Sequence, residues 1–226
     1  PAVLSVVLVG FVREPARAPS PASGDPASGA VGSGVEPTVA LEPLPARYRR
    51  VVIVLALIAV VNLPDALVLL RVSQLGFSAM GVTAVYVLYN LVYATVSYPA
   101  GALTARWPRS RVYALGLFCF AVGLGGLGLV SGGAAVVVLM AVYGGFNGCT
   151  DGVGKAWISS LVTGRVRGRA QGVFQAVSGA AVLVAGLWAG LAWDAGPGHG
   201  VVPLVVCACV AGLSAASLIL AGRRLG

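Results

Sequence analysis

Two side chains of opposite charge lie four residues apart inside an apolar stretch. Asp151 and Lys155 both fall between Ala134 and Val162, where most other residues are hydrophobic. Because positions four apart share one face of a helix, the carboxylate and the ammonium group can form an ion pair. An ionisable residue at the centre of a bilayer costs about 2.5–3.5 kcal/mol on insertion scales, so it normally faces a bundle interior or a watery cavity. The pair is therefore either structural, with Lys155 reaching the lipid headgroups, or part of a gating or coupling site.

A second carboxyl group, that of Asp65, follows Asn62 and Pro64 in another apolar run. Pro64 has no N–H and removes one helical hydrogen bond near the middle of that run, so we expect a break or kink there. Arg71 lies six residues after Asp65 and does not share its face on a straight helix, so an ion pair between them would need the kink.

Polar side chains recur on single faces of several helices. Around Asp151, a polar stripe runs along one face and a stripe of small residues runs beside it. The polar stripe consists of Tyr143, Asn147, Asp151, Lys155 and Ser159, and the small stripe of Gly144, Gly148, Gly152, Ala156 and Ser160. Other polar faces are formed by Tyr86, Asn90, Tyr93 and Ser97 with Tyr89 beside them, and by Gln171, Gln175 and Ser178. The small stripe predicts close packing of a neighbouring helix.

The elements that carry these residues are long apolar runs. Hydrophobic residues make up 58% of the 226 residues and charged residues 10%, and the mean hydropathy is +0.93, which is typical of an integral membrane protein. The runs cover residues 50–71, 79–103, 111–131, 134–161, 169–193 and 201–221, and each is close to the roughly 20 residues that cross a bilayer. They do not alternate as the strands of a transmembrane β-barrel do. We therefore predict an all-α, polytopic membrane protein with six transmembrane helices.

The polar residues are distributed unevenly over these runs. The first, second, fourth and fifth carry them, whereas the third and sixth have no charged or amide side chain within the apolar run. This distribution predicts two three-helix repeats, each with two helices that face a cavity. Pro64 and the glycines around Asp151 are expected to interrupt the first helix of each repeat, and corresponding interruptions indicate a binding site near the midplane.

The arginines predict the topology. They lie before the first run and after the second, fourth and sixth, whereas residues 72–78, 131–133 and 194–200 contain no Lys or Arg. The positive-inside rule then places both the segment before the first run and the C-terminus in the cytoplasm. The net charge of +8 follows from this pattern, so we expect no nucleic-acid partner.

The remaining segments complete the domain organisation. Residues 13–46 are rich in Pro, Ala, Gly and Ser and are predicted to be a flexible cytoplasmic linker. Residues 1–12 are too short to span a membrane, and we interpret them as the end of a truncated transmembrane helix that precedes the six-helix domain of residues 47–226. His199 is the only histidine and lies in a loop, and the four cysteines lack metal-site spacing. We therefore expect no metal, no cofactor and no catalytic residues.

Three features make the chain resemble the C-terminal six-helix half of a major facilitator superfamily transporter. Residues 101–112, GALTARWPRSRV, are similar to the loop motif of that family. The matching positions are Gly101, Leu103, Arg106, Arg109 and Arg111, and the departures are Ala105 for Asp and Pro108 for Gly. Residues 143–162 and 167–179 are similar to the fourth and fifth helices of such a half, and the layout of linker and six runs is the third feature. The loop arginines either fix topology alone, with contacts to lipid headgroups or helix C-termini, or form a conformational latch.

The resemblance implies a secondary transporter of the inner or plasma membrane that moves a small solute by alternating access, with protons as the coupling ion. The partners it implies are the lipid bilayer, a small-molecule substrate, and a missing N-terminal six-helix half of the same polypeptide. The implied substrate and proton pathway contains Asn62, Asp65, Arg71, Tyr89, Asn90, Tyr93, Asn147, Asp151, Lys155, Gln171 and Gln175. Asp65 is the expected proton-coupling group because an apolar setting favours a neutral carboxyl group, although it can equally be a structural acid. The alternative function is a self-contained six-span scaffold or dimer.

Overall fold

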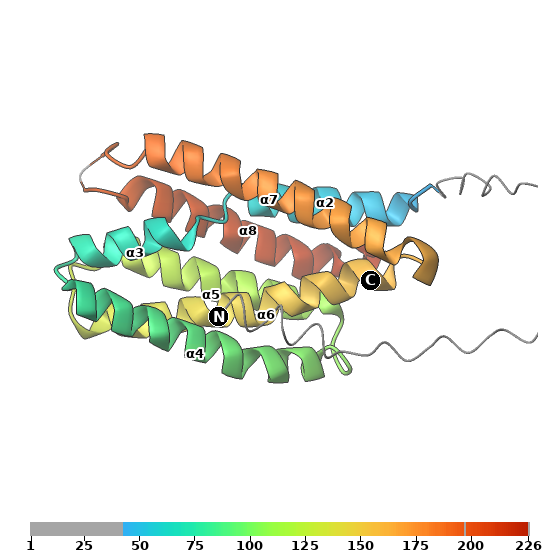
Figure 1. Ribbon diagram of the computed structural model, residues 1–226, viewed down its shortest axis with the longest axis horizontal. Coiled ribbons are helices and arrows are strands. Elements are labelled where there is room, and N and C mark those ends of the chain that lie inside the picture. The colour runs from blue at the N-terminus through green and yellow to red at the C-terminus, as the bar shows by residue number, and fades with distance from the viewer. Residues whose placement is uncertain (1–42, 197, 226) are drawn as a thin grey trace, which may run out of the picture. The chain divides into compact units, whose positions relative to one another are not determined.

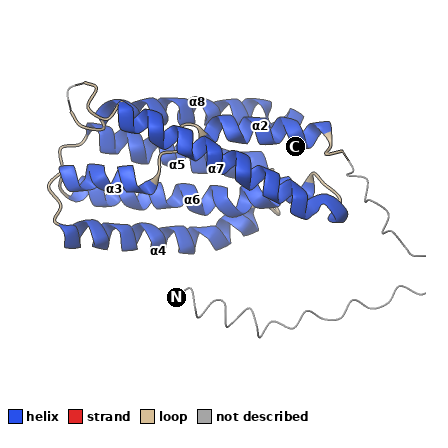
Figure 2. Cartoon of the chain, turned by 45° about the horizontal axis from the view of Figure 1, so that its top comes forward, coloured by secondary structure: helices blue, strands red, loops and turns tan. Residues whose placement is uncertain are grey.

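The computed structural model describes residues 43–196 and 198–225, with side chains described as far as Leu220. The predicted helix end at residues 1–12 and nearly all of the predicted linker lie outside these residues. The described part is helical and contains no strand (Figures 1 and 2). Its elements are α2 Ala46–Ala59, α3 Asp65–Gln74, α4 Ala79–Leu103, α5 Arg109–Leu129, α6 Ala134–Ser160, the short 3₁₀ helix η1 Gly164–Val166, α7 Arg167–Leu191 and α8 Val201–Leu225.

Five of the predicted spans appear as single helices. Helices α4 to α8 are each long and apolar enough to cross a membrane, and their bounds agree closely with the predicted runs. The first predicted run, residues 50–71, is instead two shorter helices, α2 and α3, joined by residues 60–64 (Figure 1). The interruption predicted at Pro64 is therefore confirmed, and it divides the first run into two helices.

The break follows from the chemistry of proline. Pro64 cannot donate a backbone hydrogen bond to the carbonyl of Val60, four residues earlier, and it disfavours helical geometry at the preceding residue. The indole Nε1 of Trp188 in α7 donates to this carbonyl at 2.9 Å. Pro64 is itself the N-cap of α3, and the N–H of Leu67 donates to its carbonyl at 3.0 Å. The break is thus stabilised by a neighbouring helix.

Helix α6 packs closely against α4 through small residues. A Cβ at Gly144 would lie 2.6 Å from the carbonyl oxygen of Tyr89, and a Cβ at Gly148 would lie 2.8 Å from Val96 Cγ1. The predicted packing stripe is therefore confirmed at these two positions. It does not extend further, since a Cβ at Gly152 would meet nothing within 4 Å and Ala156 is exposed.

The glycines do not interrupt α6. The helix runs without a break from Ala134 to Ser160, so the expectation of a second interruption near Asp151 is wrong. Glycine weakens a helix only modestly, and here close packing against neighbouring helices offsets that cost. On the α5 side, a Cβ at Gly116 would lie 2.6 Å from Thr150 Cγ2, so α6 is closely packed there too. Only the first of the two predicted repeats contains a broken helix.

The helices differ in how far their neighbours cover them. Of the most apolar 18 residues in each helix, 50% are buried in α5 and 56% in α6, against 11% in α4 and 17% in α7. Helices α5 and α6 therefore form the centre of the described bundle, while α4 and α7 present broad uncovered apolar faces.

The arginines gather at one end of the bundle, which we call the arginine end. It is formed by the start of α2, the α4–α5 loop, the end of α6 and the start of α7. Two contacts join these segments: Tyr48 Oη donates to the carbonyl of Ala170 at 2.8 Å, and Arg109 Nη1 donates to Ser160 Oγ at 3.1 Å. The described arginines at this end are Arg47, Arg49, Arg50, Arg106, Arg109, Arg111, Arg165, Arg167 and Arg169.

Candidate functional site

A cavity of about 260 Å³ lies among α2, α4, α5, α6 and α7. Its lining combines aromatic rings, amides, hydroxyl groups and one carboxylate. The lining residues are Leu55, Ala59, Asn62, Tyr93, Tyr113, Phe146, Asn147, Thr150, Asp151, Phe174, Gln175, Ser178 and Val182. A concave, largely apolar site with a few convergent polar groups is the usual form of a small-molecule site.

Five of the predicted pathway residues line this cavity, and they come from four segments of the chain. Asn62 lies in the break between α2 and α3, Tyr93 in α4, Asn147 and Asp151 in α6, and Gln175 in α7. The break therefore places the amide side chain of Asn62 at the cavity. A continuous helix would orient this side chain differently.

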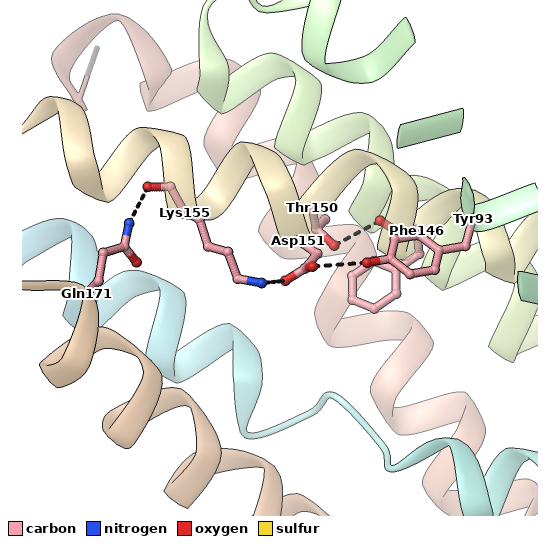
Figure 3. Close-up of polar contacts among 6 residues, drawn as sticks. All are labelled: Tyr93, Phe146, Thr150, Asp151, Lys155 and Gln171. Carbon is pink, nitrogen blue, oxygen red and sulfur yellow. Dashed lines mark hydrogen bonds and ion pairs between the residues drawn. The ribbon is translucent and has the colours of Figure 1, made fainter. Parts of the chain in front are cut away.

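Asp151 forms the predicted ion pair. Its Oδ1 lies 2.8 Å from Lys155 Nζ, and its Oδ2 accepts a hydrogen bond of 3.0 Å from Tyr93 Oη in α4 (Figure 3). Both charged side chains are 44% exposed. The pair is thus a neutral unit at the cavity wall with one further hydrogen bond across the helix interface.

Asp65 lies in a different environment. It is the first residue of α3, where the positive end of the helix dipole favours a negative charge. Its Oδ1 accepts a hydrogen bond of 3.0 Å from Tyr143 Oη, and Tyr89 Oη lies 3.2 Å from its Oδ2. Both tyrosines are buried, whereas Asp65 itself is half-buried. Two phenol groups from two other helices therefore hold this carboxylate.

A chain of hydrogen bonds links Asp65 to the cavity. Asn147, which lines the cavity, donates its amide to Tyr89 Oη, and Tyr89 in turn donates to Asp65. The rings of Tyr89 and Tyr143 stack with their centroids 5.2 Å apart, and Phe120 packs against Tyr143 at 5.9 Å. The stacked rings fix the positions of both phenol groups.

Gln171 links α7 to α6 on the arginine side of the cavity. Its Nε2 donates to the carbonyl of Lys155 at 2.7 Å (Figure 3). The same nitrogen also donates to Ser159 Oγ at 2.7 Å. This amide positions the two helices relative to each other and does not itself line the cavity.

Two predicted pathway residues lie elsewhere. Arg71 is buried at the opposite end of the bundle, where it donates to the carbonyls of Leu127 at 3.2 Å and His199 at 2.9 Å. It therefore anchors the end of α5 and the α7–α8 loop, and it makes no ion pair with Asp65. Asn90 is exposed and donates to the carbonyl of Tyr86 in its own helix at 2.8 Å.

Other residues of the site were absent from the predicted pathway. Tyr143 belongs to the predicted polar stripe of α6, four residues before Asn147, and that spacing is the signal for its role. Tyr113 and Thr150 line the cavity but give no such signal, because a single tyrosine or threonine in an apolar run is usually a packing residue.

Among the described residues, no three His, Cys, Asp or Glu side chains gather as a metal site requires.

In the loop motif, the arginines take different positions. Arg109 is half-buried and bonded to Ser160 of α6, whereas Gly101, Arg106 and Arg111 are exposed.

Comparison with known proteins identifies the family. The model of the Major Facilitator Superfamily matches residues 51–224. An uncharacterized MFS-type transporter of Methanocaldococcus jannaschii is 26% identical over 165 residues, which cover 70% of this chain and 42% of the archaeal protein. The chain thus spans less than half the length of this relative, and no solved structure matches it significantly. Because the family model covers residues 51–224, which include all five long apolar helices and the cavity, the chain belongs to the Major Facilitator Superfamily.

Proposed function

We propose that the chain forms the C-terminal six-helix half of a secondary active transporter that moves a small solute by alternating access, coupled to protons at Asp65. Family membership and a relative described as a transporter support transport in general. The observation that carries the finer proposal is the setting of Asp65. Its carboxylate accepts bonds from two tyrosines and belongs to neither ion pair found among the described residues.

Asp65 suits a coupling role because its charge is not compensated by a neighbouring cation. Binding of a proton to this carboxylate removes a charge from a largely apolar environment. The ionised carboxylate, in turn, is stabilised by the two phenol donors and by the start of α3. Since Tyr89 also accepts the amide of Asn147, a solute that bonds to Asn147 competes for the same hydrogen-bond chain.

The ion pair has a separate role in this proposal. Asp151 and Lys155 compensate each other's charge, so the cavity presents a dipole rather than a net charge on that side. Together with Tyr93, Gln175 and Asn62, this suits a solute with several hydrogen-bonding groups and a modest apolar surface.

The second half of the transporter would cover the exposed faces of α4 and α7. Both helices are apolar and little buried in the described bundle, and the archaeal relative extends well beyond the aligned region. In this arrangement α2 and α3 together make the first of six spans. The arginine end faces the cytoplasm, as the positive-inside rule requires.

The proposal is tested with the complete polypeptide in lipid vesicles that contain a pH-sensitive dye. Sugars, small organic acids and amphipathic cations are added in turn, and a solute whose entry changes the internal pH identifies a coupled substrate. Asp65→Asn should then reduce uphill, proton-driven accumulation about 100-fold or more while leaving downhill exchange of the same solute measurable. The matched control is Asp194→Asn, since Asp194 is an exposed loop carboxylate paired with His199.

Undiminished uphill accumulation by Asp65→Asn would remove this residue from coupling. Absence of transport of every solute by the wild-type polypeptide, with correct insertion, would favour the scaffold alternative.

A further inference from the structure

A second cavity, of about 360 Å³, lies at the arginine end and shares no lining residue with the first. It is formed by the start of α2, the α4–α5 loop, the start of α5 and the end of α6. Its lining consists of Arg47, Thr104, Trp107, Pro108, Arg109, Ser110, Trp157, Ser160 and Leu161. Two arginines, three hydroxyl groups and two indole rings therefore meet there, and none of the lining residues is acidic.

Two polar atoms of this cavity have no hydrogen-bond partner. Arg109 Nε and Ser110 Oγ are both buried, and neither bonds to another group in the described part of the chain. Ser110 is only 2% exposed. Buried polar groups almost always have a hydrogen-bond partner in folded proteins, so such a pair indicates a site for a bound ligand. The adjacent Nη1 of Arg109 does bond, to Ser160 Oγ, so the guanidinium group is held in place while its Nε remains available.

The same two residues open helix α5, which is 21 residues long. The N-cap is Pro108, no side chain caps the helix, and its first turn contains no acidic residue. The first N–H groups of a helix have no partner within the helix and carry its partial positive charge. They form a natural site for an anion when cationic side chains lie beside them.

We propose that this cavity binds a phosphate oxyanion. Arg109 contributes charge and the donor Nε, Ser110 contributes a hydroxyl donor, and the uncapped start of α5 contributes backbone N–H groups. Arg47 adds a second positive charge from α2. The phosphate belongs either to the headgroup of an anionic phospholipid or to a soluble phosphate, and both present the same oxygens. Binding there joins α2, α5 and α6 at one point and stabilises their arrangement.

The experiment measures ligand-induced thermal stabilisation of the complete polypeptide in phosphate-free detergent. The probes are sodium phosphate and short-chain phosphatidylglycerol, and the controls are sodium chloride at equal ionic strength and the matching diacylglycerol, which lacks phosphate. We expect saturable stabilisation by at least one phosphate probe and none by either control. Arg109→Gln should raise the half-saturating concentration about tenfold, because it removes a charge-assisted donor. Ser110→Ala should raise it about threefold, because it removes one neutral donor.

The matched control variant is Arg106→Gln, which removes the same charge from an exposed position of the same loop outside the cavity. Stabilisation by phosphatidylglycerol alone identifies a lipid headgroup, and stabilisation by sodium phosphate as well identifies a site for soluble phosphate; both support the proposal. The proposal is overturned if neither probe stabilises the protein, or if Arg106→Gln weakens binding as much as Arg109→Gln. Should Arg109→Gln fail to fold, Ser110→Ala decides the question, because it removes a single oxygen atom.

Discussion

Asp151 lines the cavity, and Asp65 is linked to it through Tyr89 and Asn147, yet the partners of the two carboxylates differ. Asp151 is compensated by Lys155 on its own helix, whereas Asp65 is held by the phenol groups of Tyr89 and Tyr143 from two other helices. Removing the charge of one member of an ion pair leaves the other charge without its partner. A carboxylate held by neutral donors can gain a proton without leaving an unpaired charge. In the proposed mechanism, this difference makes Asp65, and not Asp151, the group that binds the proton.

The first prediction concerns how α4 is held over Asp65. In Gly144→Ala, the new methyl group would lie 2.6 Å from the carbonyl oxygen of Tyr89, so α4 must move away. We expect a loss of about 3 kcal/mol in the free energy of unfolding in detergent, the upper end of the range for overpacked cores. The matched control is Gly152→Ala beside Asp151, where a Cβ meets nothing within 4 Å. Equal destabilisation by both variants would contradict the dependence of the Asp65 site on close packing.

The second prediction compares removal of each charge. Asp151→Asn leaves Lys155 unpaired in a half-exposed position. We therefore expect the free energy of unfolding to fall by about 2 kcal/mol, between the values for exposed and buried ion pairs. Adding Lys155→Gln to this variant should restore most of the lost stability, because no unpaired charge then remains. Asp65→Asn strands no cation but weakens two hydrogen bonds to the carboxylate, so we expect a smaller loss, of about 1 kcal/mol. Thermal melts of the three purified variants measure these differences. If the double variant is no more stable than Asp151→Asn alone, the loss does not come from an unpaired Lys155.

The third and smallest effect concerns the helix break beside Asp65. In Trp188→Phe, the carbonyl of Val60 loses its indole donor while most of the ring packing remains. We expect a loss of about 1 kcal/mol, the usual net value of one hydrogen bond, measured by denaturant unfolding in detergent. The matched control is Trp107→Phe at the arginine end, whose indole makes no hydrogen bond among the described residues. An equal loss in the control would indicate a general cost of replacing tryptophan.

Local features of the fold were predictable from the sequence. The apolar runs predict the bounds of α4 to α8 closely because arginine, glycine and proline residues mark their ends. The ion pair of Asp151 and Lys155 was predictable because four residues separate them on one helix face.

Long-range features were not predictable. The bond from Tyr143 to Asp65 joins residues that are 78 positions apart. On α4, the sequence favours a polar face that contains Tyr86 and Asn90, but the packing of Gly144 and Gly148 against the helix rotates Tyr89 inward and leaves Asn90 exposed. Rotation of a helix about its axis depends on its neighbours, and hydropathy alone does not determine it.

The most direct test of proton binding at Asp65 is infrared difference spectroscopy of the complete polypeptide in lipid, between acidic and alkaline buffer. Proton binding to a carboxylate creates a carbonyl band that the ionised form lacks. We predict that this band is present in the wild type, persists in Asp151→Asn and disappears in Asp65→Asn. A band that persists in Asp65→Asn, or disappears in Asp151→Asn instead, would contradict the assignment of the proton to Asp65.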